Sequence, residues 1–153
     1  MAHSSFTSEQ DFAAAYEQYA DDIFRHCYLR VFSRDKAKVL MTEAYTRLWQ
    51  FIAEGNCVDS MRLFLYRMSH QIITREKAAG VVETAVPRLQ PQDQDYAELS
   101  LLQQVSPEDR PVLILHYVDG FSLQDISSIL DGAVQDHALA LRKGTSLLSS
   151  LLQ

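Results

Sequence analysis

The sequence predicts an all-α protein made of two small helical domains. Apolar residues recur at three- and four-residue steps along most of its 153 positions, which is the period of amphipathic helices. Serine, threonine and glycine residues stand where such helices would begin and end. Residues 80–95 carry two prolines and three glutamines and lose the helical period, which is typical of a linker. We therefore assign residues 1–79 and 96–153 to the two domains.

The composition favours a folded protein that is not basic. Hydrophobic residues make up 47% of the chain, enough for a packed core, and the formal net charge is −6. A nucleic-acid role must therefore rest on local patches. The two cysteines, Cys27 and Cys57, do not form a disulfide framework. No leader-like segment begins the chain and no apolar run reaches about 18 residues, so we expect a cytoplasmic protein without a membrane contact.

Three helices are expected in the first domain. The expected starts are the Thr7–Gln10 capping box, Ser33, and Asp59 or Ser60. The second helix is expected to stop at Gly55-Asn56 and the third near Gly80. Apolar residues at helical spacing form the inward faces: Phe12, Tyr16, Tyr19, Ile23, Cys27 and Val31 in the first helix; Ala37, Leu40, Met41, Ala44, Tyr45, Leu48, Trp49 and Ile52 in the second; Met61, Phe64, Leu65, Met68 and Ile72 in the third.

The second domain is expected to begin with the apolar period that resumes at Tyr96, Leu99, Leu102 and Val105. Ser106 and Pro107, with the acids that follow, predict the start of a helix that runs to Gly120. Pro111 is tolerated because it lies early in that helix. The expected continuation is a Ser122–Asp125 capping box, a short helix to Leu130, the turn Asp131-Gly132, and a last helix with Val134, Ala138, Leu141, Leu148 and Leu152 inward.

Residues 122–148 have the layout of a helix-turn-helix, in which a short helix, a glycine turn and a second helix follow one another. In DNA-binding proteins the second helix enters the major groove, where the base edges can be read. Helical hairpins with glycine turns are also common in proteins that bind no DNA, so the layout alone does not decide the function.

A resemblance to extracytoplasmic-function (ECF) sigma factors covers nearly the whole chain. Their promoter-binding C-terminal domain is similar to residues 105–110 (VSPEDR) and 113–130 (LILHYVDGFSLQDISSIL). Their polymerase-binding helix is similar to residues 37–49 (AKVLMTEAYTRLW), and their promoter-melting helix to residues 64–71 (FLYRMSHQ). The resemblance implies a sigma region-two-like domain, a region-four-like helix-turn-helix domain, and a factor that directs the RNA polymerase core to promoter DNA.

The resemblance also implies which residues touch each partner. For the polymerase they are Leu40, Glu43 and Arg47. For promoter DNA they are Arg67, His70, Gln71, Arg75 and Lys77 in the first domain, and Gln135, His137, Arg142 and Lys143 in the second. For both histidines an ordinary surface position is the alternative, and for Arg142-Lys143 a solvated pair near the helix C-terminus.

Several positions depart from the family pattern. Lys38, Val39 and Thr42 replace acidic and amide residues of the polymerase-binding helix, and Gln135, His137 and Ala140 replace basic residues of the recognition helix. Residues 97–153 hold three basic and seven acidic residues. Because each phosphate contact adds a counterion-release term to affinity, we expect weak intrinsic DNA binding, with an anti-sigma factor or accessory protein as a further partner.

These departures keep a second interpretation open, a sigma-mimic adaptor that binds an anti-sigma factor or another protein and has lost DNA recognition. A third, an unrelated helical bundle, would make the order of the motifs a coincidence. We expect no enzyme activity, cofactor or metal, because no catalytic, ligand-spaced or phosphate-cradling arrangement occurs in the sequence. Core packing is expected for Tyr45, Trp49, Phe64 and Cys27, and a surface position for His26, while Tyr66 fits either the core or base stacking.

Overall fold

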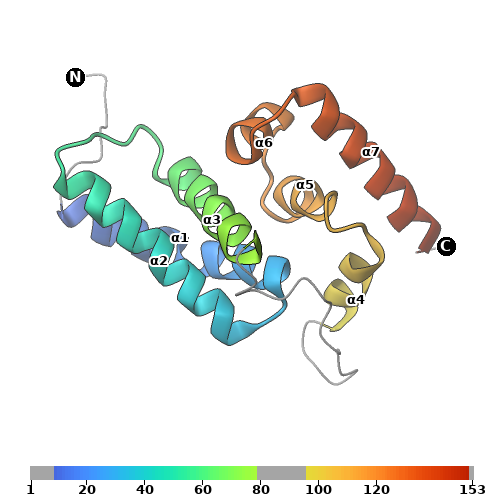
Figure 1. Ribbon diagram of the computed structural model, residues 1–153, viewed down its shortest axis with the longest axis horizontal. Coiled ribbons are helices and arrows are strands. Elements are labelled where there is room, and N and C mark those ends of the chain that lie inside the picture. Colours follow the sequence, from blue (N-terminus) through green and yellow to red (C-terminus); the bar gives the residue numbers. More distant parts are fainter. Residues whose placement is uncertain (1–8, 79–95, 152–153) are drawn as a thin grey trace.

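The computed structural model describes residues 9–78 and 96–151 and confirms the predicted all-α class (Figure 1). The described residues hold no β-strand. Their elements are α1 (Glu9–Val31), α2 (Arg34–Ala53), α3 (Met61–Ala78), α4 (Tyr96–Gln104), α5 (Arg110–Leu113), the π-helical segment η1 (Ile114–Val118), α6 (Leu123–Leu130) and α7 (Val134–Leu151). The expected Thr7 cap, the linker at 80–95 and Leu152 lie outside the described residues.

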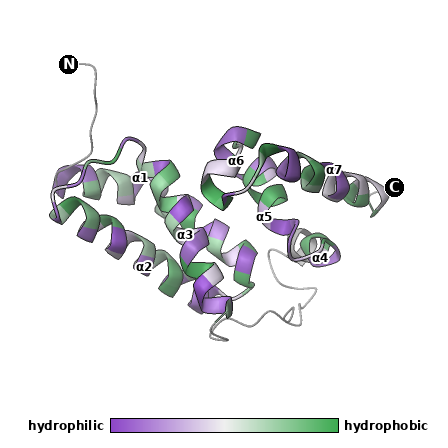
Figure 2. Cartoon of the chain, turned by 45° about the horizontal axis from the view of Figure 1, so that its top comes forward, coloured by the Kyte–Doolittle hydropathy of each residue, from purple (hydrophilic) through white to green (hydrophobic). Residues whose placement is uncertain are grey.

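The helices α1, α2 and α3 form a three-helix bundle in the N-terminal half (Figure 1). Serine side chains cap the N-termini of α2 and α3. The Ser33 hydroxyl accepts a hydrogen bond from the Lys36 amide, and the Ser60 hydroxyl accepts one from the Leu63 amide. Gly55, with φ of 89°, ends α2 as expected. Hydrophobic and hydrophilic residues alternate along each helix (Figure 2), so that one side of every helix can face the core.

The third helix buries more of its circumference than its apolar stripe predicts. Met61, Leu65 and Ile72 are buried as expected, but Tyr66 and Ser69 are buried too. The reason is that α3 packs against α1 and α2 on one side and against α6 on the other. Tyr66 is therefore a core residue in this structure, and Phe64 is half-buried against Phe51.

Three expectations for the first domain need correction. Tyr16, expected on the inward face of α1, is 46% exposed, and its ring lies 4.9 Å from that of Tyr45. His26 was expected at the surface, and this is wrong, because its side chain is fully buried where η1 and α3 cover α1. Trp49 was expected in the core, but it remains 37% exposed while its ring packs edge-on against Phe12. Tyr45 and Cys27 are buried as expected.

The helix expected to begin at Pro107 begins later, at Arg110. Residues 107–109 form a turn instead, because the Ser106 hydroxyl donates to the Asp109 carboxylate and does not cap a backbone amide. At the other end, the last turn before Gly120 is π-helical: the Asp119 amide donates to the Ile114 carbonyl at 3.1 Å. Gly120 then reverses the chain with φ of 74°.

The predicted helix-turn-helix is present as α6, a tight turn and α7 (Figure 1). The Ser122 hydroxyl accepts from the Asp125 amide at 3.2 Å and starts α6. Asp131 and Gly132 both have positive φ, which turns the chain sharply into α7. Helix α7 is only shallowly buried: Ala138, Leu141 and Leu148 are half-buried as expected, but Val134 is exposed.

One hydrophobic core runs through both halves. Its N-terminal members, which include Leu48 and Tyr66, are continuous with Leu115, Phe121 and Ile126 of the C-terminal half. The contact is made mainly by α3 with α6, and by α1 with η1. Among the described helices, none has a stretch both long and apolar enough to cross a lipid bilayer.

Replacing Gly144 with alanine is expected to destabilise the protein. A Cβ at this buried position of α7 would lie 2.5 Å from Leu113 Cδ1 and 2.8 Å from its Cγ, and Leu113 is itself buried. Overpacking of this kind costs about 1–3 kcal/mol, which exceeds the gain in helix propensity of about 1 kcal/mol. Urea unfolding followed by circular dichroism measures the difference. Ser149→Ala, at an exposed position of the same helix, is the control without a clash, and an equal rise in stability for both variants would contradict the close contact.

Candidate functional site

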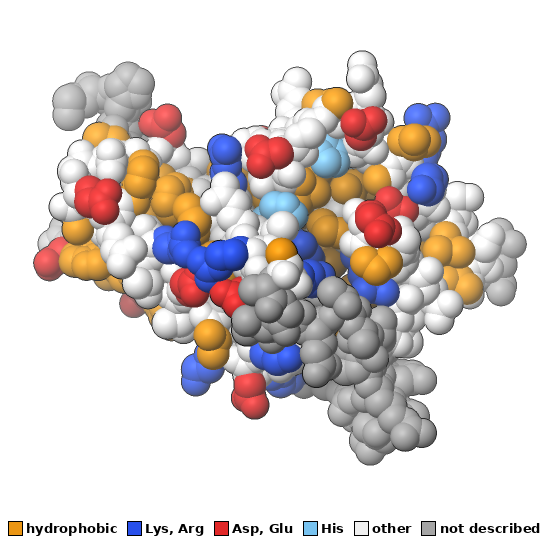
Figure 3. Space-filling view, viewed as in Figure 1, with side chains coloured by type: hydrophobic (Ala, Val, Ile, Leu, Met, Phe, Trp, Pro, Cys, Tyr) orange, Lys and Arg blue, Asp and Glu red, His pale blue; other side chains and the backbone are white. Residues whose placement is uncertain are grey.

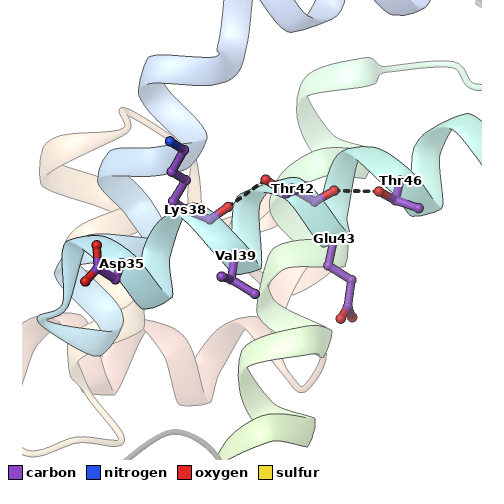
Figure 4. A pocket seen from close by; sticks show the side chains of 6 residues that line it. All are labelled: Asp35, Lys38, Val39, Thr42, Glu43 and Thr46. Carbon is purple, nitrogen blue, oxygen red and sulfur yellow. Dashed lines mark hydrogen bonds between the residues drawn. The ribbon is translucent and has the colours of Figure 1, made fainter.

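The outer face of α2 carries an open groove of about 620 Å³ (Figure 4). Its lining residues are Asp35, Lys38, Val39, Thr42, Glu43 and Thr46. Thr42 and Thr46 donate their hydroxyl protons to the carbonyls of Lys38 and Thr42, both at 2.8 Å, which ties the two threonines to their own helix. The groove therefore offers one apolar side chain, Val39, between charged residues of both signs.

The structure divides the three residues predicted to bind polymerase. Glu43 and Arg47 lie on the surface, where Arg47 Nη2 is 3.3 Å from Glu43 Oε2. Leu40 is only 4% exposed and belongs to the bundle core, whereas its neighbour Val39 is 67% exposed. A partner that docks on this face would therefore contact Val39, with Leu40 holding the helix in place beneath it.

Arg75, predicted to contact DNA, joins this same surface. Its Nη2 lies 2.7 Å from Glu43 Oε2, and it also bonds to Glu76, so the pKa of Arg75 is raised by these two hydrogen bonds. Glu43 thus links α2 to α3 through Arg75, and it pairs with Arg47 on its own helix. Such exposed pairs add little stability. The Glu43 carboxylate nevertheless offsets positive charge of Arg47 and Arg75 that could otherwise attract the phosphates of a nucleic acid.

The remaining predicted residues of α3 differ in accessibility. Gln71 is exposed, and Arg67 lies 3.8 Å from Asp131 of the α6–α7 turn. His70 is half-buried and accepts a hydrogen bond from Arg30 at 3.2 Å. Burial, followed by the charge on Arg30, lowers the pKa of His70 to about 3, so the ring is neutral at physiological pH. Burial beside Arg30 and Arg110 lowers the pKa of Lys77 to about 8.

Helix α7 presents few cations. His137 Nε2 donates to the Asp131 carbonyl at 2.6 Å and so stabilises the turn between α6 and α7. Lys143 lies 3.7 Å from Asp109. Gln135 and Arg142 are exposed. Red and blue side chains are interspersed on the face shown in Figure 3, and histidines lie between the two halves. The predicted DNA-contacting residues of the two halves thus do not merge into one basic stripe on that face.

Sequence reasoning missed the polar contact between the halves, which centres on Asp119. The Tyr66 hydroxyl donates to Asp119 Oδ1 at 2.7 Å, Arg25 lies 3.5 Å from the same oxygen, and Arg62 donates to the Asp119 backbone carbonyl. His26 Nδ1 is 3.5 Å from Oδ2 but makes no hydrogen bond to it. The sequence did not predict this contact, because the π-helical turn that directs the Asp119 side chain inward has no recognisable sequence pattern.

Burial sets the protonation states around Asp119. The pKa of Tyr66 is raised first by burial and then by the negative Asp119, so its hydroxyl keeps the proton that it donates. Burial lowers the pKa of His26 below its usual 6.5, and the Asp119 contact offsets only part of this shift. The described residues contain no cluster of His, Cys, Asp and Glu that could hold a metal ion.

The buried histidines make stability depend on pH. His26 and His70 have lowered pKa values in the fold, so the unfolded chain binds protons more readily below about pH 6.5. Stability is fully present above that pH and is lost as the pH falls, by about 1.4 kcal/mol per unit for His70. His26 adds a loss of the same sign. Urea unfolding between pH 6.5 and 5, where carboxylates contribute least, measures the slope.

The control is the double variant His26→Gln/His70→Gln, which should flatten the slope whatever it does to the absolute stability. An unchanged slope would show that neither ring is held neutral by the fold.

Comparisons with known proteins support the fold. No family model and no curated protein sequence matches the chain. Among solved structures, it is similar to the sigma factor RpoE in complex with the anti-sigma factor NepR from Bartonella quintana (TM-score 0.74, 18% identity, covering 94% of this chain and 97% of that one). It is also similar to CnrH in complex with the cytosolic domain of CnrY (TM-score 0.72, 14% identity, 95% and 89%).

A third similar structure is the anti-anti-sigma factor PhyR complexed with NepR from Bartonella quintana (TM-score 0.61, 14% identity). It matches over 91% of this chain, which spans about half of that protein, 49% of its length. At these identities the likeness concerns the fold. The chain has the two-part helical fold of ECF-type sigma factors.

Proposed function

We propose that the protein is an ECF-like sigma factor that directs the RNA polymerase core to promoters. The observation that carries this proposal is the match of both halves, in order and over 94–95% of the chain, to RpoE and CnrH. The proposed role is not enzymatic and is cytoplasmic, since it requires contact with polymerase and promoter DNA. Residues 1–79 and 96–153 are the proposed domains, with 80–95 between them.

The outer face of α2 is the proposed docking surface for polymerase. Val39 supplies its exposed apolar contact, and Glu43 and Arg47 supply polar contacts at the edge. This refines the expectation from the sequence, because Leu40 contributes as a support beneath the surface.

The proposed DNA contacts come from both halves. Arg67 and Gln71 offer exposed polar groups on α3, and Gln135 and Arg142 on α7. His70, Arg75, Lys77, His137 and Lys143 are proposed as secondary contacts, because each is already half-buried or engaged with a neighbour. So few free cations predict weak intrinsic affinity, with the polymerase supplying most of the binding.

Binding to the polymerase core tests the docking surface. Val39→Glu should weaken binding by about tenfold or more, because it puts a charge into the apolar centre of the interface. Ala13→Glu, which adds the same charge at an exposed position of α1, should bind as the unmodified protein does. A pull-down with core polymerase, followed by promoter-dependent transcription, gives the measurement. No binding and no transcript from the unmodified protein would refute the proposal.

A sigma-mimic adaptor is the second candidate. Two observations favour it: the fold also occurs in PhyR, which is named an anti-anti-sigma factor, and the exposed face of α7 carries apolar Val134 and Leu139. An adaptor of this kind would bind an anti-sigma factor or another protein through these faces, and it would show no DNA affinity at any salt concentration.

Adding a cation to α7 separates the two candidates. If α7 lies against DNA, Gln135→Lys should raise promoter affinity and steepen the log–log salt dependence by about 0.9. Ser149→Lys places the same charge near the far end of the helix and should change the slope less. Fluorescence anisotropy with labelled promoter duplex and polymerase, over a salt series, gives both slopes. Equal slopes for the two variants would favour the adaptor.

A further inference from the structure

Asp119 is a carboxylate from the C-terminal half that is enclosed by the N-terminal half. Its side chain has no exposed surface. The side chains that surround it come from α1 and α3: Arg25 and His26 from the first, Arg62 and Tyr66 from the second. A buried carboxylate is costly unless it is paired and hydrogen-bonded, so its position depends on the halves staying together.

Tyr66 makes the most directional contact to this carboxylate, with its hydroxyl 2.7 Å from Oδ1. Arg25 is more distant, at 3.5 Å, and is shared with Asp22. Phe121, two residues beyond Asp119, closes the contact: its ring lies 4.8 Å from the Tyr66 ring and 3.9 Å from the Arg62 guanidinium. The apolar rings supply buried area, and the Tyr66–Asp119 bond fixes the relative position of the halves.

The contact also leaves some buried polar atoms without a partner. Both ring nitrogens of His26 and the Oδ2 atom of Asp119 are buried without a hydrogen-bond partner. Unsatisfied buried groups cost free energy that water would recover on separation. Separation of the halves would return water to these groups, which offsets part of the cost of breaking the contact.

Closure reaches one edge of the α3 face to which the proposed function assigns DNA contacts, whereas Gln71 and Arg75 stay exposed. Asp131, in the α6–α7 turn, lies 3.8 Å from Arg67. Asp119 occupies Arg25 with its carboxylate and Arg62 with its backbone carbonyl. Oxygen atoms of the C-terminal half thus stand against three arginines of α1 and α3, where phosphate oxygens of a bound strand would otherwise stand.

We infer that Asp119 is an intramolecular latch: it holds the two halves closed and thereby keeps a DNA strand from Arg25, Arg62 and Arg67. The part concerning DNA rests on the proposed function, whereas the latch itself rests on the contacts alone. In the latched form Arg25, Arg62 and Arg67 face carboxylate and carbonyl oxygens of the same chain. Contact of a strand with all three arginines therefore requires the halves to separate.

A distance measurement between the halves tests the latch. Cys57 is exposed and Cys27 is buried, so spin labels can be placed at Cys57 and at Ser146→Cys, an exposed position on α7. Pulsed electron spin resonance of the full chain then reports the separation. Tyr66→Phe should shift the distribution to longer and broader distances, because loss of a hydrogen bond to a charged group favours the open form by about tenfold or more. Asp119→Asn, which keeps an accepting oxygen but removes the charge, should shift it in the same direction by less.

Tyr45→Phe is the matched control. It also removes a buried tyrosine hydroxyl, which donates to the Ala15 carbonyl at 3.1 Å, but that bond lies within the first bundle. Its distance distribution should equal that of the unmodified protein. If Asp119→Asn loses helical content, Tyr66→Phe decides the question, because its C-terminal half is unaltered. A distribution for Tyr66→Phe that matches Tyr45→Phe would overturn the latch.

Binding of a fluorescent single-stranded promoter oligonucleotide separates this inference from the proposed function. Tighter binding by Tyr66→Phe than by Tyr45→Phe supports both. Open halves without any oligonucleotide binding support the latch and count against DNA reading by α3. Closed halves in Tyr66→Phe, together with promoter-dependent transcription, overturn the latch and leave the proposed function standing.

Discussion

The burial of one carboxylate determines how the two halves of this chain are arranged. Asp119 cannot lie in a dry interior unless donors reach it, and those donors are the Tyr66 hydroxyl and the Arg25 guanidinium. Because these side chains belong to α1 and α3, the position of α6 is set relative to the first bundle. The continuous core through Tyr66, Phe121 and Ile126 follows from that placement. The pairing of Arg67 with Asp131 follows from it as well.

The fold was largely predictable from the sequence, because helix boundaries are local. Ser33, Ser60 and Ser122 cap their helices as their positions indicate, and Gly55 and Gly120 end theirs. The errors lie where a tertiary contact overrides a local signal. His26 is buried because η1 and α3 cover it, and the helix expected at Pro107 starts later because Ser106 bonds to Asp109.

The candidate surfaces were less predictable than the fold. Position in a motif identified Glu43, Arg47 and Arg75, but not that Glu43 contacts both arginines. It also selected Leu40 where Val39 is the exposed neighbour. When a helix is buried on two sides, the pattern of residue types along it does not predict which side faces solvent. Helix α3, which packs against α1 and α2 on one side and α6 on the other, is the clearest case. For the same reason the Asp119 contact, which joins residues 53 and 94 positions apart, had no sequence signature.

The π turn at Ile114–Val118 has a consequence for how this chain tolerates changes in length. A π turn holds one residue more than an α-helical turn, and it is this extra residue that brings Asp119 under the first bundle and leaves Tyr117 partly exposed beside α7, where its hydroxyl bonds to Thr145. Loss of a single residue there would restore a regular helix and rotate everything beyond it by about 100°. Relatives of this protein that differ by one deletion in this segment would keep every helix and yet present the C-terminal hairpin in another direction.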